Sequence, residues 1–596
     1  MASATESPAP LIVVPPTTPR EQLPDQQVLQ VLNRLGYGPR PGDVEKVRAM
    51  GVDNWIALQL TPERIDDHAA DSVIAADYPA LDTPTSDMVV ASRDAQEARR
   101  REQLKLRNDG DTASKRDVRK AALQDDPQLR DLQRRVQEPV NELVSAKMAR
   151  AVISDRQLQE VMVDFWENHF SVYVAKAQTR LYLNAYDRDV IRPHALGKFR
   201  DLLGAVAHSP AMLYYLDNWE SQADSTHATL AAVQNRNRVA RAPQRGVRFP
   251  NPLARPNPNA NRLPPSMQDL PPEQRERVLQ QQAARRGRGL NENYARELME
   301  LHTLGVDGGY TQHDVIEVAR CLTGWTIDQR NGTFVFRPQM HDADTKYVLG
   351  HEIPAGRGEE DGEEVLDILA HHPSTAHFIA KKLVVRFVSD SAPPALVERA
   401  AQTFLRTDGD IREVVRTIVT SPEFFSRAAY RAKVKTPFEL VASALRAMNA
   451  QPDPTPRVAG IVQRLGQQTF GRLTPDGWPD RGDAWMNTGA ILNRINFGVQ
   501  LANGGVPGAP FRNWPYATTL RTASHEEQVD GVVKAILGGE VSQVTRNVLM
   551  TGENPLLKKA QSDSATNAPM FTPSNGMPGL QQVVGLALGA PEFQRR

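Results

Sequence analysis

LNENYARELMELHTLGVDGGYTQHDVIEVARCLTGW, residues 290–325, contains two helix patterns joined by a glycine-rich turn. In the first pattern Asn291 is a typical N-cap, Tyr294 and Leu298 belong to one apolar face, and Gly305 is a typical stop signal. A helix with one apolar face must bury that face against other elements. The stretch therefore predicts two amphipathic helices inside a packed helical protein.

The second pattern begins at Thr311, and Asp314 stands three residues later, which is the spacing of a helix-capping pair. His313 lies between them and is expected to be exposed. Similar patterns occur along much of the chain. They begin at Ser154, where the capping-box spacing recurs, at Ser209-Pro210, at Thr436 and at Trp485.

Only Thr333–Arg337 alternates as a β-strand does, and it follows the turn-forming pair Asn331-Gly332. We therefore predict a mainly α protein, a large multi-helix globular bundle with at most one short β-hairpin. The organisation we expect has five parts. They are a disordered tail (1–24), an N-terminal helical part (25–92), a charged helical arm (93–135), a main helical domain (136–234 and 289–596) and an Arg/Asn/Pro-rich insertion (235–288).

The insertion has seven arginines and no acid between Arg236 and Arg262. A basic strap for a phosphate or polyanion is one interpretation, but no aromatic platform beyond Phe249 is interleaved with the arginines. A polar, disordered insertion is the interpretation that we favour.

Composition excludes several classes of protein. Lys plus Arg equals Asp plus Glu, at 71 each, so no overall charge suggests nucleic acid as a partner. The single cysteine, Cys321, excludes an intrachain disulfide framework and multi-cysteine metal sites. No signal peptide is recognisable, no run of 18 apolar residues predicts a transmembrane segment, and localisation stays open. Phosphate-loop, dinucleotide, HExxH and GxSxG motifs are absent.

The candidate site is a row of oxygen-bearing side chains on the first helix of the opening stretch. Asn293, Glu297 and Glu300 have the spacing of one helix face, and His302 follows them. Such a row suits a divalent metal ion or an acid and base pair. We therefore predict His302, Glu297 and Asn293 as catalytic residues. The alternatives are that the acids face solvent or pair with Arg296, and that His302 is an imidazolium favoured by the helix dipole.

The predicted metal ligands are Glu297, Glu300, His169, His341 and Asp342. His169 lies on an apolar helix face, where a core histidine bonded to a carbonyl is the main alternative. His341 and Asp342 belong to a polar loop that a solvated turn would resemble. Asp480, Arg481 and Asp483 in the loop 474–483, framed by Trp478 and Trp485, form a further candidate rim, although such a loop can also simply plug a core.

Several long segments together resemble one known family. They are DFWENHFSV (164–172), HSPAMLYYLDN (208–218), the segment 291–325 quoted above, HDADTKYVLG (341–350), KTPFELVASALRA (435–447) and GWPDRGDAWMNTGAILNRINF (477–497). In this order they resemble the bacterial family catalogued as domain of unknown function 1800. The resemblance implies a chiefly helical protein, commonly exported and often encoded beside a sulfatase-like protein, and it brings no established activity.

Two functions remain open at this point. The first is an envelope-associated hydrolase in which the carboxylates hold a divalent cation or a water and a histidine moves the proton. The second is a non-catalytic binding or assembly partner of a co-produced enzyme, such as the sulfatase-like protein, whose polar motifs fix helix packing.

Overall fold

The computed structural model describes residues 19–108, 127–241, 289–553 and 579–596. For residues 102–108 and 239–241 it describes the backbone alone. The described residues form 24 α-helices and two short antiparallel strand pairs, so the protein is mainly α, as predicted. Most of the predicted insertion and tail lie outside these residues.

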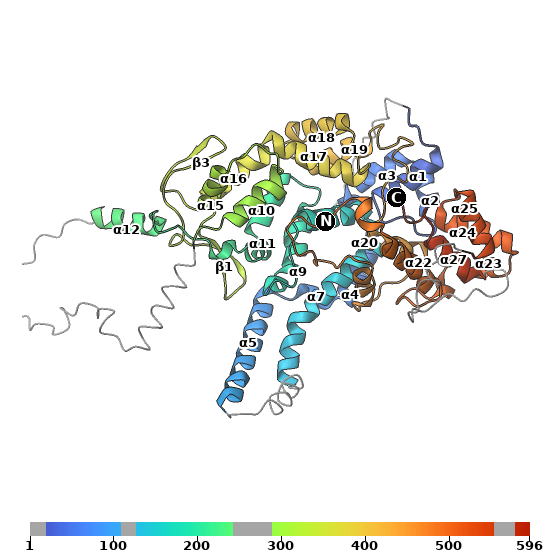
Figure 1. Ribbon diagram of the computed structural model, residues 1–596, viewed down its shortest axis with the longest axis horizontal. Coiled ribbons are helices and arrows are strands. Elements are labelled where there is room, and N and C mark those ends of the chain that lie inside the picture. The colour runs from blue at the N-terminus through green and yellow to red at the C-terminus, as the bar shows by residue number, and fades with distance from the viewer. Residues whose placement is uncertain (1–18, 109–126, 242–288, 554–578) are drawn as a thin grey trace, which may run out of the picture.

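The N-terminal third contains four short helices and one long hairpin (Figure 1). The hairpin helices α5 and α7 project from the body of the molecule. The elements are α1 (Pro24–Arg34), α2 (Asp43–Met50), α3 (Val52–Gln59), α4 (His68–Asp77), α5 (Thr85–Asn108) and α7 (Pro127–Ile153). The charged arm predicted from the sequence is thus, in its described part, helical.

In the middle of the chain, helices pack on both sides of the stretch 290–325. These are α8 (Gln157–His169), α9 (Leu183–Ala185), α10 (Phe199–His208), α11 (Pro210–Tyr215), α12 (Leu230–Arg241), α14 (Glu292–Glu297), the π-helical turn η7 (Leu298–Thr303), α15 (Gln312–Cys321), α16 (Glu360–His371), α17 (Pro373–Phe387), α18 (Pro394–Arg406) and α19 (Ile411–Val419).

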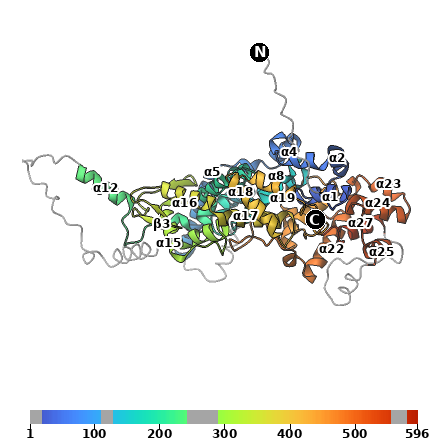
Figure 2. The same ribbon diagram turned by 90° about the horizontal axis from the view of Figure 1, so that it is seen from above.

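The C-terminal part returns to the N-terminal helices, which lie beside it in both views (Figures 1 and 2). Its helices are α20 (Pro437–Ala447), α21 (Arg457–Arg464), α22 (Thr488–Ala502), α23 (Ala517–Arg521), α24 (His525–Leu537), α25 (Gln543–Thr551) and α27 (Leu580–Leu588). On α1, Gln30 Nε2 donates to the carbonyl of Phe424 at 3.0 Å and Arg34 Nη2 donates to that of Ala429 at 2.7 Å. The N-terminal helix α1 is thus hydrogen-bonded to the second half of the chain.

Short helical turns connect the main helices. They are η1 (Pro62–Arg64), η2 (Pro79–Asp82), η3 (Thr179–Leu181), η4 (Tyr186–Ile191), η5 (Arg192–His194), η6 (Asn218–Glu220), η8 (Gly482–Trp485) and η9 (Phe511–Asn513).

The predicted strand is present, and it has a partner that the sequence did not reveal. β2 (Thr333–Phe336) pairs in antiparallel register with β1 (Trp325–Asp328). A second pair, β3 (Lys346–Val348) with β4 (His351–Ile353), turns at Leu349-Gly350. The structure therefore has two short hairpins, both at the end of the molecule that contains α15 and α16 (Figure 1).

Most of the capping signals are confirmed, and one is wrong. Asn291 Oδ1 accepts from the Tyr294 N–H, and Ser209 and Thr311 cap their helices as predicted. Ser154 does not open α8, which begins at Gln157. Its hydroxyl donates to Asp67 Oδ2 at 2.6 Å and accepts from the Arg156 N–H at 3.0 Å, so it closes a local turn before the helix.

One large apolar core contains residues from Val28 to Phe593, and a small second cluster joins Ile74 and Tyr78 to Ala146 and Ala149. Cys321, the single cysteine, is buried in the large core, and burial raises the pKa of its thiol. None of the described helices combines the length and the apolar content needed to cross a lipid bilayer.

Candidate functional site

A cavity of about 340 Å³ lies where α7, α8, α17 and α20 meet the loop 467–481. Three of the segments that carry the family resemblance contribute to its wall, namely 164–172, 435–447 and 477–497. Segments far apart in sequence are thus brought to one concave site, which is the usual setting of a small-molecule site.

The loop is fastened to α8 by one side chain. Asn168 donates from Nδ2 to the carbonyl of Trp478 at 2.8 Å and accepts from the Trp478 N–H at 2.7 Å. Gly477 beside it has a positive φ of 74°, and a Cβ there would lie 2.2 Å from the Asn168 carbonyl oxygen. Only glycine allows this close approach.

Gly477→Ala is therefore expected to lower the free energy of unfolding by about 2–3 kcal/mol, through backbone strain plus the clash with Asn168. Gly350→Ala is the matched control, because Gly350 has φ 83° and open space around its missing Cβ. The control should cost only about 1 kcal/mol, from backbone strain. Equal losses in chemical denaturation would contradict the close packing of the loop on α8.

A buried ionic network forms one wall of the cavity. The Lys147 ammonium lies 2.8 Å from Asp164 Oδ1 and also contacts Glu167 Oε2. Burial disfavours the ammonium, but the two carboxylates outweigh it and raise the pKa of Lys147 above its ordinary value. Burial, reinforced by Asp187 and opposed by Lys147, raises the pKa of Glu167 to about 8.

His169 is buried, with 2% of its surface exposed, and lines the same cavity. Its Nε2 donates to the carbonyl oxygen of His302 at 3.1 Å, since a carbonyl can only accept. Its Nδ1 has no hydrogen-bond partner within the described ranges of the chain. Burial, and then the Lys382 and His302 charges, lowers the pKa of His169 well below its ordinary value. His169 is therefore a neutral imidazole with one fixed tautomer and one unused lone pair.

Lys382 on α17 lines the cavity as well. No hydrogen bond or ion pair joins it to another described residue, and its ammonium lies 5.4 Å from the centre of the Phe378 ring. Burial lowers the pKa of Lys382 to about 8, although Asp480 and Asp476 oppose the shift. A partly desolvated cation without a counter-ion is suited to an anionic group of a ligand.

None of the three predicted catalytic residues lines the cavity, although the His302 carbonyl binds His169, which does. His302 is 2% exposed, and burial, assisted by Lys382, lowers its pKa to about 3. It is therefore neutral and not the dipole-stabilised imidazolium that the sequence allowed. Burial, and then the Glu300 and Asp476 carboxylates, raises the pKa of Glu297. Asn293 is exposed.

One alternative was that Glu300 pairs with Arg296, but these two residues do not pair. Glu300 Oε2 accepts from the Tyr310 hydroxyl at 3.1 Å, whereas Arg296 lies 3.7 Å from Glu292 Oε2. The π-helical turn η7 follows Glu297, and the Glu300 carboxylate is still near enough to Glu297 to raise its pKa.

His341 and Asp342 belong to a different buried network. His341 Nε2 lies 3.2 Å from Asp361 Oδ2, and Lys346 Nζ donates to the same oxygen at 2.6 Å. Asp342 Oδ2 accepts from Arg320 Nε at 2.8 Å. The loop is thus a buried, hydrogen-bonded connector between α15 and α16 rather than a solvated turn.

The structure brings His169 and His302 together and keeps His341 and Asp342 apart from them. Among the described residues, no three of the five predicted ligands offer atoms within 4.8 Å of one another. The catalytic and metal-binding roles of these residues stay predictions.

Sequence reasoning missed Lys382, Lys147 and Asn168. Asn168 stands beside His169 in a quoted segment, so its position was a usable signal. Lys382 lies in Lys381-Lys382 on an amphipathic helix, where a lysine pair ordinarily faces solvent, and no local signal marks it. The loop 474–483, predicted as a candidate rim, contributes Asp476, Trp478, Asp480 and Arg481 to the cavity wall, and the ring centres of Trp478 and Trp485 lie 5.9 Å apart.

Comparison with known proteins gives one match. The model of the DUF1800 family, described as a protein of unknown function, matches residues 30–595. No curated protein and no solved structure matches the chain.

Proposed function

We propose that this chain, which belongs to the DUF1800 family, is a hydrolytic enzyme. Its active site is the cavity between α7, α8, α17, α20 and the loop 467–481. The observation that carries the proposal is the state of His169. Its imidazole is neutral, its tautomer is set by the His302 carbonyl, and its Nδ1 lone pair has no hydrogen-bond partner among the described residues. A general base needs an unprotonated lone pair within reach of the proton that it removes, and Nδ1 of His169 is such a lone pair.

In this proposal His169 Nδ1 takes a proton from a water in the cavity, and the resulting hydroxide attacks the substrate. His302 is a positioning residue that acts through its carbonyl. Glu167, whose pKa burial raises to about 8, can take up and release a proton near neutral pH and is the candidate acid for the leaving group.

Lys382 supports an anionic substrate. Its ammonium has no described counter-ion, and it faces a cavity that already places Arg386 and Arg472 along the wall. A substrate carboxylate, phosphate or sulfate would supply the missing charge. The substrate class is therefore an anionic ester or amide small enough for about 340 Å³.

The test is a hydrolysis screen with the full chain, using chromogenic carboxylic, phosphoric and sulfuric esters that carry an anionic group. His169→Gln keeps a donor for the His302 carbonyl but removes the base, so kcat should fall by about 10²–10⁴-fold. Lys382→Met should raise KM more than it lowers kcat, because it removes binding that ground state and transition state share.

His313→Gln is the control, because His313 is exposed on another helix. An H169Q variant as active as H313Q would overturn the assignment of the base. A folded wild-type protein that hydrolyses no member of the screen would count against the hydrolase itself.

The second candidate function is a binding partner of a sulfatase-like protein, and the projecting α5–α7 hairpin favours it (Figure 1). Arg99 and Arg100 are exposed on α5. If the hairpin is the docking arm, reversing both charges to glutamate should abolish recovery of the partner in a pull-down while hydrolysis is unchanged.

A further inference from the structure

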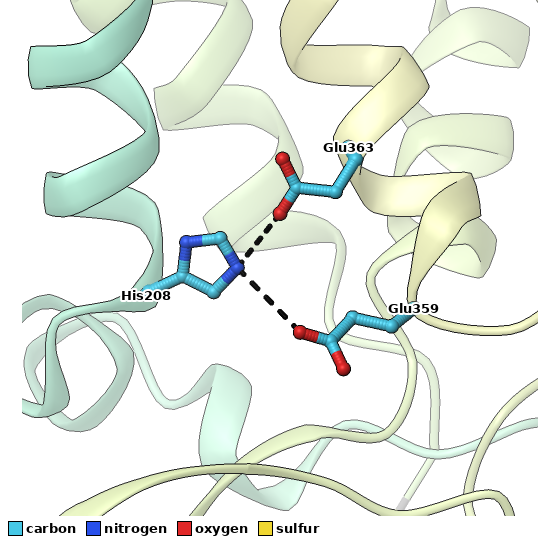
Figure 3. Close-up of side chains that lie close together, drawn as sticks. All are labelled: His208, Glu359 and Glu363. Carbon is cyan, nitrogen blue, oxygen red and sulfur yellow. Dashed lines mark ion pairs between the residues drawn. The ribbon is translucent and has the colours of Figure 1, made fainter.

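A second group of chemically capable side chains lies away from the cavity, where α10 ends beside α16 (Figure 3). His208 Nε2 is 2.8 Å from Glu363 Oε1 and 4.0 Å from Glu359 Oε1. Within the described ranges these residues are the one set of three or more His, Cys, Asp or Glu whose ligand atoms lie within 4.8 Å of one another. All three are partly exposed.

The orientation of His208 is fixed by the backbone and by two rings. Its Nδ1 lies 2.7 Å from the carbonyl oxygen of Gly204 and must donate to it. The ring stacks on Trp325 at 4.4 Å and meets the edge of Phe334 at 4.6 Å. Nε2 is thereby held toward the carboxylates. Metal-bound histidines ordinarily have this second hydrogen bond to a carbonyl or carboxylate.

The start of α16 is held equally firmly. A Cβ at Gly362 would lie 2.2 Å from Trp325 Cζ2, so only glycine lets α16 lie directly on this ring. Glu359 and Glu363 stand four residues apart, which places both carboxylates on the same face of the helix. One aromatic ring, Trp325, thus positions both the imidazole and the helix that carries the two acids.

The local charges do not balance. Glu363 Oε2 accepts from Arg200 Nη2 at 2.7 Å, and Arg200 is shared with Asp367. Glu359 has no ion pair in the described part of the chain except the 4.0 Å approach to His208. The carboxylates of Glu359, Glu363 and Asp367 thus lie around the Arg200 guanidinium and the His208 imidazole. A bound cation would compensate the excess of negative charge.

We propose that this site binds one divalent transition-metal cation through His208 Nε2 and one oxygen each from Glu359 and Glu363. One nitrogen and two oxygen donors suit Zn²⁺ or Mn²⁺, whereas Ca²⁺ takes six to eight oxygens. Ligand distances of about 2.0–2.2 Å need a shift of about 1 Å by the half-exposed Glu359 side chain. Water completes the coordination. The site is independent of the hydrolytic cavity.

The experiment is calorimetric titration of the full chain, freed of metal by chelation, with Zn²⁺ and separately with Mn²⁺. The expected result is one ion per chain for at least one of the metals. Glu359→Gln should weaken that binding by at least tenfold and abolish the rise in Tm that saturating metal produces in the wild type. His208→Asn should lose binding as well.

Glu360→Gln is the matched control, because Glu360 is an exposed neighbour on the same helix turn and outside the cluster. If His208 and Glu363 form only an ordinary ion pair, neither metal binds stoichiometrically and the proposal is overturned. Equal affinities for E359Q and E360Q, or binding that survives H208N, would also overturn it. These outcomes leave the hydrolase proposal untouched, since none of these residues lines the cavity.

Discussion

Glu439→Gln is expected to lower the free energy of unfolding by about 3–5 kcal/mol, because removing one partner of a buried ion pair leaves the other charge uncompensated. Glu439 is 3% exposed. Its Oε1 accepts from Arg386 Nη1 at 2.6 Å and lies 3.1 Å from Arg596 Nη2. Its charge also counters the desolvation that lowers the pKa of Lys435 to about 7. Glutamine would leave several buried cations without their nearest anion.

The control is Glu527→Gln. Both residues are the third helical position of a capping box, with Thr436 and Ser524 as the respective N-caps, but Glu527 is exposed. Glutamine can maintain a capping box, so the exposed variant should lose at most about 1 kcal/mol. Denaturant unfolding measures both. A small, equal effect would mean that Asp480 and Asp164 suffice as counter-ions for the buried arginines.

Acid should destabilise the protein through His302. Its pKa is lowered to about 3 in the folded state, against an ordinary value of about 6.5. Between these values the unfolded chain binds the additional proton, so stability is lost as the pH falls below 6.5. From pH 7 to pH 4 this one group should cost roughly 3 kcal/mol. His169, whose pKa is lowered in the same way, adds to the effect.

Comparison with His302→Gln isolates this contribution from the carboxylates that also titrate in acid. The stability difference between wild type and H302Q should change by roughly 3 kcal/mol between pH 7 and pH 4, to the disadvantage of the wild type. H313Q, which alters an exposed histidine, should follow the wild type. Parallel curves for wild type and H302Q would show that His302 is not held neutral.

Local signals predicted the helices and their beginnings well. Asn291, Ser209 and Thr311 cap helices as expected, because a cap needs only its own backbone neighbours. The prediction for Ser154 was wrong, since its hydroxyl accepts from the Arg156 N–H in a turn before the helix and donates to Asp67, 87 residues away in sequence. The mainly α fold follows from periodicity, whereas the partner strand Trp325–Asp328 has no alternation that marks it.

The candidate site was predictable only in part. His169 and the loop 474–483 were singled out and both line the cavity. The prediction of the row Asn293, Glu297 and Glu300 was based on a regular α-helix. No residue in the sequence indicates the π-helical turn that follows Glu297. Lys382 carries no local signature, because tertiary packing alone gives it its neighbours. His208 begins the quoted segment 208–218, but nothing in that segment indicates Glu359 and Glu363 as its partners.

The contacts of α1 with the second half of the chain have a consequence for synthesis. The carbonyls that Gln30 and Arg34 bind belong to Phe424 and Ala429, almost 400 residues downstream. At about 5–20 residues per second, a ribosome needs roughly 20–80 s to make that stretch. Throughout that interval the Gln30 amide and the Arg34 guanidinium lack their final acceptors. Docking of α1 is therefore timed by translation, and a chaperone that shields this helix during elongation should raise the yield of folded protein.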